Sequence, residues 1–137
     1  MFSHIMVPVD LHMTEPVSKA LDVAVDMART YGARVTLVNV TGDMVTAAPH
    51  GEAQAADALG QVAERLADKA GIAVHTKVVF SHDVPAEVNA ILRETAETLG
   101  ADLVVVGSHA PRFMDYLFSS HAGSLASHSS VSVFVVR

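Results

Sequence analysis

Residues 99–107 decide the fold of this chain, and they are Leu99-Gly100-Ala101-Asp102-Leu103-Val104-Val105-Val106-Gly107. Gly100 stands where a helix C-terminus favours a residue that adopts positive φ. The run from Asp102 to Val106 is apolar without alternation, which is typical of a parallel strand covered on both faces. The stretch therefore predicts a helix that ends at Gly100 and a buried strand directly after it.

Four other short runs rich in β-branched residues have the same character. They span Ile5–Val9, Arg34–Val40, His75–Phe80 and Val131–Val136. Between the strands, apolar residues at three- and four-residue spacing predict helices over Thr14–Tyr31, Glu52–Ala70 and Pro85–Leu99, with a fourth near His121–His128. This alternation predicts an α/β fold, a three-layer doubly wound sandwich around a five-stranded parallel sheet of order 3-2-1-4-5, which is Rossmann-like. Gly71 is expected to end the second helix, and Pro85 to open the third as its first residue.

The composition limits the classes of function. We expect a single domain over residues 1–137, because 50% of the residues are hydrophobic and this length supports one core. A net charge of -6 with nine Lys and Arg argues against a dedicated nucleic-acid binder. The chain has no Cys, which excludes disulfides, thiolate metal sites and cysteine nucleophiles. It shows no export signal and no apolar run of about 20 residues, so we expect a cytoplasmic protein without a membrane anchor.

The doubly wound fold also predicts where a ligand binds. In such sheets, ligands lie outside the carboxyl ends of the strands, at the point where the winding reverses. Three segments follow these ends: Pro8-Val9-Asp10, Val40-Thr41-Gly42 and Gly107-Ser108-His109-Ala110.

The order of several segments resembles the universal stress protein (UspA) superfamily. The family signature is Gly-x-x-Gly, about nine residues, and then Gly-Ser or Gly-Thr at the start of a helix. Here Gly107-Ser108-His109-Ala110 and Ser119-Ser120 occupy these positions with eight residues between them, and Ala110 and Ser119 replace glycines. Ile5–Asp10, Leu37–Val40 and Leu99–Ser108 are similar to the family's first, second and fourth strands, and Tyr116–Ala122 is similar to the UspF and UspG subgroup. The resemblance covers essentially the whole chain and implies a fold like that of the adenine nucleotide alpha hydrolases.

The resemblance implies that the ligand is an adenine nucleotide, ATP or AMP with or without Mg²⁺. Pro8, Val9 and Asp10 would flank the nucleoside, with the Asp10 carboxylate accepting hydrogen bonds from ribose hydroxyls. Val40 would contact the adenine.

The phosphates would lie against the segment that follows the fourth strand. The resemblance places Val106 and Gly107 beside the ribose and phosphates, and Ser119 and Ser120 at a helix start that holds the phosphates. Arg112 is a candidate on chemical grounds, because a guanidinium forks onto phosphate oxygens. The predicted nucleotide-binding set is completed by His109, Ala110 and His121.

These residues also have structural interpretations. Asp10 is able to bond the amides of the following turn, Ser119 and Ser120 are able to cap a helix, and Arg112 is a typical solvated cation. The histidines lack Cys or clustered carboxylate partners, so no metal site is predicted. No nucleophile elbow, P-loop or dinucleotide fingerprint is present, so no catalytic residue is predicted and at most weak ATP hydrolysis is expected.

The last predicted strand, Val131–Val136, suggests a homodimer. It is an apolar edge without Pro or Lys, and the simplest cover is the same strand of a second copy about a two-fold axis. The resemblance implies a dimer there too. Three functions stay open: a nucleotide-binding stress-response or regulatory module with possible protein partners, a dimeric interaction domain that binds no nucleotide, and a slow ATP hydrolase.

Overall fold

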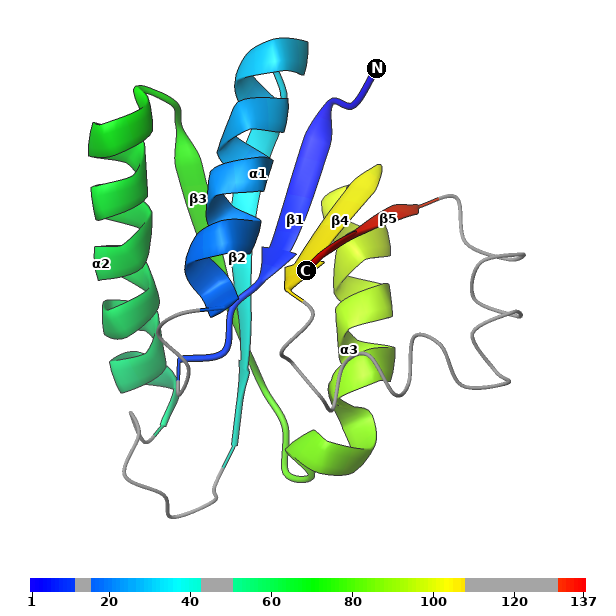
Figure 1. Ribbon diagram of the computed structural model, residues 1–137. Helices are drawn as coiled ribbons and strands as arrows, with labels where there is room; N and C mark the ends of the chain where they lie inside the picture. The colour runs from blue at the N-terminus through cyan, green and yellow to red at the C-terminus, as the bar shows by residue number, and fades with distance from the viewer. Residues whose placement is uncertain (12–15, 43–50, 108–130) are drawn as a thin grey trace.

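The chain folds into one parallel sheet with helices on both faces (Figure 1). The computed structural model describes residues 1–11, 16–42, 51–107 and 131–137. The strands are β1 (His4–Pro8), β2 (Arg34–Thr41), β3 (Val74–Phe80), β4 (Leu103–Gly107) and β5 (Ser132–Val136). The helices are α1 (Pro16–Tyr31), α2 (Glu52–Ala70) and α3 (Val84–Leu99). The order β3-β2-β1-β4-β5 confirms the predicted doubly wound topology, while the helix predicted near residues 121–128 lies outside the described residues.

Alternate strand residues pack against different helices, so the sheet carries two separate cores. Ile5 and Val7 belong to the core beneath α1 and α2, together with Leu37. Met6 and Val38 point to the opposite face and pack with α3. Because β1, β2 and β4 are covered on both faces, apolar residues occupy consecutive positions in each of them.

The helix ends follow local chemistry. Gly71 adopts the left-handed conformation with φ 66° and donates its N–H to the Ala67 carbonyl, which confirms it as the stop of α2. Pro85 is the second residue of α3 rather than the first, because the helix begins at Val84. Tyr31 lies in the apolar stripe of α1 but is 41% exposed, with its ring edge-on to Phe2. No helix in the described ranges is long and apolar enough to cross a bilayer.

A polar network closes the amino edge of the sheet. The Asp102 carboxylate accepts hydrogen bonds from the Ser3 hydroxyl at 2.7 Å and from the Ser3 and His4 amides at 2.8 and 3.0 Å. Burial alone would raise the pKa of Asp102, but these hydrogen bonds together hold it below its usual value. The network ties the start of β1 to the start of β4.

His4 extends this network into the core. Its ring is buried, with Nδ1 3.0 Å from the Leu99 carbonyl and Nε2 2.8 Å from the Thr36 hydroxyl. A carbonyl only accepts, so Nδ1 carries the proton and Nε2 accepts from Thr36 in the neutral ring. Burial lowers the pKa of His4, and the nearby Arg34 charge lowers it further. The neutral ring therefore links β1, β2 and the end of α3.

Candidate functional site at the carboxyl edge

Strands β1 and β4 separate before they reach the carboxyl edge. They share two register pairs, Ile5↔Leu103 and Met6↔Val104, whereas β1 and β2 share five. The backbone of β1 alternates between its neighbours, since the Ser3 carbonyl and the Val9 N–H bond to β2 and the His4 carbonyl accepts from Asp102. By this alternation, the N–H of residue 8 would donate to β4, but residue 8 is a proline and has no N–H. Pro8 therefore ends the ladder at the point where the winding of the fold reverses.

Strands β1 and β2 diverge just after this point. The Val9 N–H still donates to the Val38 carbonyl at 2.8 Å, but the Val9 carbonyl accepts from the side-chain amide of Asn39 at 2.9 Å. Asn39 is a buried polar residue near the end of β2. We did not predict a role for it from the sequence, although a polar residue inside a strand covered on both faces needs a hydrogen-bond partner.

The end of β2 is fixed against the β3–α3 turn. The Thr41 carbonyl accepts a hydrogen bond from the Ser81 N–H at 2.8 Å. The buried Ser81 hydroxyl donates a hydrogen bond to the Glu87 carboxylate and accepts one from the Asp83 N–H. A Cβ at Gly42 would lie 2.6 Å from the Ser81 carbonyl oxygen, so only glycine fits this approach without a shift. The turn thus packs directly against the end of β2.

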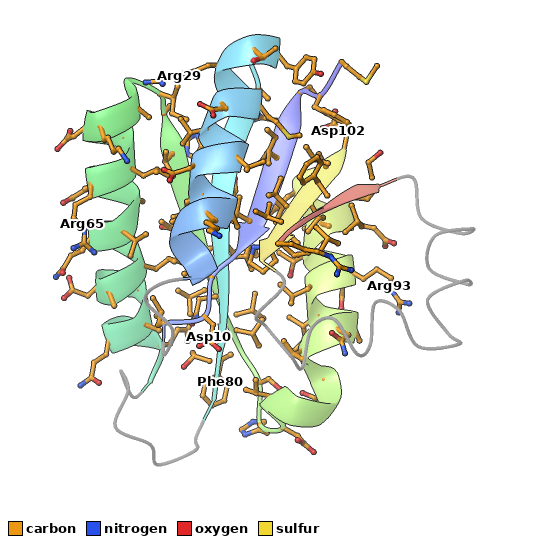
Figure 2. The ribbon with its side chains drawn as sticks, in the orientation of Figure 1. Asp10, Arg29, Arg65, Phe80, Arg93 and Asp102 are labelled. Atoms are coloured by element: carbon orange, nitrogen blue, oxygen red, sulfur yellow. The ribbon has the colours of Figure 1, made fainter. Side chains whose placement is uncertain are left out.

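The described residues of the predicted set gather at this edge. Val9 and Val106 are buried, Val40 and Gly107 are partly exposed, and Asp10 is exposed. Val40 and Val106 belong to the core on the α3 face, which places their side chains on the same side of the sheet. Figure 2 shows Asp10 at the same edge as Phe80 and far from Asp102. The other predicted residues, His109, Ala110, Arg112, Ser119, Ser120 and His121, lie outside the described residues.

The chemistry of this edge suits a nucleoside. It combines apolar side chains on both faces of the sheet, strand-end backbone groups that are able to pair with a base, and the Asp10 carboxylate, which is able to accept from hydroxyls. Among the described residues, no three His, Asp or Glu side chains gather as ligands for a metal ion. Apart from Val106 and Gly107, the residues predicted to contact the phosphates lie outside the described residues.

Comparison with known proteins identifies the family. Residues 1–137 match the sequence model of the universal stress protein family. The chain belongs to this family. It is 30% identical over 149 residues to universal stress protein G of Shigella flexneri, and the match covers 100% of both chains. This confirms the resemblance predicted from the strand and loop segments.

Solved structures of universal stress proteins share the fold. One from Archaeoglobus fulgidus in complex with dAMP has a TM-score of 0.64 at 17% identity, covering 98% of each chain. Another, a universal stress protein family protein from Arabidopsis thaliana with AMP bound, has a TM-score of 0.65 at 13% identity, covering 98% of this chain and 90% of that one. At these identities the similarity establishes the sheet order and layers.

Proposed function

We propose that this universal stress protein binds an adenine nucleotide, ATP or AMP, at the carboxyl ends of β1, β2 and β4, and acts as a stress-response or regulatory binding module. The observation that carries the proposal is the end of the β1–β4 ladder at Pro8, which opens the sheet at the winding reversal. Asp10 follows directly and serves as the acceptor for ribose hydroxyls.

The family supports this choice of ligand. Two relatives with the same fold carry dAMP and AMP. In this proposal the nucleoside lies against Pro8, Val9, Asp10, Val40, Val106 and Gly107, and the backbone of Val106 and Gly107 also approaches the phosphates. The phosphates, with Mg²⁺ where ATP is bound, are assigned to His109, Ala110, Arg112, Ser119, Ser120 and His121.

We further propose that the protein works in the cytoplasm as a homodimer. The edge strand β5 supports the dimer, because Val133 is 44% exposed and Phe134 41% exposed on a strand without a charged residue. A change in the nucleotide-binding segment between β4 and β5 is then transmitted to the dimer edge or to a regulatory protein partner.

The experiment has two steps. Small molecules released from the purified protein by denaturation are identified by mass spectrometry, and AMP and ATP are then titrated into emptied protein by calorimetry. Asp10→Asn is expected to weaken AMP binding at least tenfold, because the neutral amide replaces a charge-assisted acceptor. Asp68→Asn, at an exposed position on α2, is the matched control and leaves affinity unchanged.

The alternatives give different results. No binding at millimolar AMP and ATP contradicts the proposal and favours an interaction domain without nucleotide. Release of ADP and phosphate from ATP, lost in Asp10→Asn and kept in Asp68→Asn, favours a slow hydrolase.

A further inference from the structure

Asn39, at the candidate site, has a buried polar atom that no described residue pairs with. The residue is 6% exposed, and its Nδ2 donates to the Val9 carbonyl. Its Oδ1 is buried and has no hydrogen-bond partner among the residues that the structure describes. The Val9 carbonyl can only accept, so the atom that faces it is the amide nitrogen and the unpaired atom is an acceptor. Buried acceptors without a donor are rare and costly, so each requires an explanation.

The position of Asn39 in the ladder suggests an explanation for this unpaired acceptor. In a parallel pair, alternate residues of one strand bond to the same neighbour. On β2 these are Arg34, whose N–H donates to Ser3, and Val38, whose carbonyl accepts from Val9. The next residue of β2 that faces β1 is Val40, and its N–H would be expected to donate to the Val9 carbonyl. That carbonyl instead accepts a hydrogen bond from the Asn39 side chain. The register between β1 and β2 ends at Pro8↔Val38, so the backbone of Val40 lies beyond it and faces the gap.

We propose that Asn39 is a positioning residue of the nucleoside site. Its amide group takes the Val9 carbonyl in place of the Val40 N–H, and this keeps the β1–β2 ladder open where the nucleoside enters. Its Oδ1 accepts one hydrogen bond from the bound adenine nucleoside. The contact with the nucleoside rests on the proposed function, whereas the effect on the ladder does not.

Two donors of an adenine nucleoside have the required chemistry. One is the exocyclic amine of the base, and the other is a ribose hydroxyl. Both groups belong to a ligand that reaches from Asp10 to Val40. Asn39 is next to Val40 in the chain, and its side chain is bonded to Val9, which is next to Asp10. A ligand without either donor leaves the Oδ1 acceptor unpaired.

The first experiment measures the ladder without ligand. Asn39→Leu keeps the branched shape and the number of side-chain heavy atoms and removes both polar atoms, so the Val9 carbonyl is able to accept from the Val40 N–H. Amide hydrogen exchange followed by NMR is expected to slow at Val40 by at least tenfold in the variant. Equal exchange at Val40 in both proteins overturns the ladder role.

The second experiment measures binding, with a control on the same strand. Asn39→Leu is expected to weaken adenosine and AMP binding at least tenfold. Thr36→Val removes a comparable buried polar group that bonds His4 at the amino end of β2, so it lowers stability but leaves affinity within twofold. A similar loss of affinity in both variants means that destabilisation alone explains the effect, and it overturns the positioning role.

Two analogues identify the donor. Purine riboside lacks the exocyclic amine, and 2′-deoxyadenosine lacks one ribose hydroxyl. The analogue that lacks the group donating to Oδ1 is expected to bind the wild type more weakly than adenosine does. In Asn39→Leu, this difference in affinity between adenosine and the analogue is expected to disappear. Losses that are the same in both proteins for both analogues overturn the ligand contact. Failure of the wild type to bind adenosine or AMP overturns the proposed function and the ligand contact together, while the exchange result at Val40 stands on its own.

Discussion

Pro8 sets the separation of β1 and β4, because it lacks the N–H that the next rung of their ladder requires. Pro8→Ala restores this donor, and by register the Val105 carbonyl is the group that accepts it. The added hydrogen bond and the extra freedom of the unfolded chain nearly cancel, so the free energy of unfolding should change by less than about 1 kcal/mol. AMP binding is expected to fall about tenfold as the gap closes. Calorimetry and urea denaturation test this, and an unchanged affinity would show that Pro8 does not shape the site.

His4 makes stability depend on pH. Burial lowers its pKa below 6.5, with the Arg34 and His75 charges acting in the same direction and the Leu99 carbonyl and Asp102 opposing them. The unfolded chain therefore binds this proton more readily than the folded one. The contribution of His4 to stability is fully present above about pH 6.5 and is lost as the pH falls below that value.

The pH effect can be measured by urea denaturation between pH 7.5 and 5. The wild type should lose stability over this range, and His4→Gln should show a flatter profile because its side chain does not titrate. Parallel profiles for the wild type and His4→Gln would rule His4 out as the titrating group.

At the scale of elements, the contact between β2 and the β3–α3 turn depends on Gly42. A Cβ there would meet the Ser81 carbonyl oxygen at 2.6 Å and a Val84 methyl at 2.7 Å, and the carbonyl belongs to a turn held by several hydrogen bonds. Gly42→Ala should therefore destabilise the protein by about 1–3 kcal/mol. Gly60→Ala is the control, because a Cβ there has nothing within 4 Å and the helix gains about 0.5–1 kcal/mol. Thermal unfolding should shift in opposite directions for the two variants, and a common direction would contradict the steric explanation.

The elements were largely predictable from the sequence because their signals are local. The stripe of α2 and its stop at Gly71, and the apolar run of β4, each follow from periodicity and cap chemistry. The rule that ligands bind at strand ends also predicted that Pro8, Asp10 and Val40 share one edge. Asn39 was not predicted, because its role arises from the register between β1 and β2. That register depends on tertiary packing, whereas the run Val38-Asn39-Val40 shows only a polar residue in a strand.

At the scale of the molecule, the two edges of the sheet differ in design. At the amino edge, Asp102 and His4 bond β1 to its neighbours and to the end of α3. At the carboxyl edge, Pro8 and Asn39 end the ladders on the two sides of β1. One edge therefore holds the scaffold together, and the other is where the ladders of β1 end and the nucleotide is proposed to bind.

The edge strand β5 gives a test of the proposed homodimer. The Ser132 N–H donates to the Asp102 carbonyl, so by alternation the backbone of residue 133 faces away from β4, where a second copy would pair. Val133→Pro removes this outward N–H without removing a β4–β5 hydrogen bond. Light scattering is expected to show a dimer for the wild type and a monomer for the variant. Val133→Thr keeps both the N–H and the β-branch and should remain dimeric, whereas a monomeric wild type, or a dimer that persists in Val133→Pro, would place the partner elsewhere.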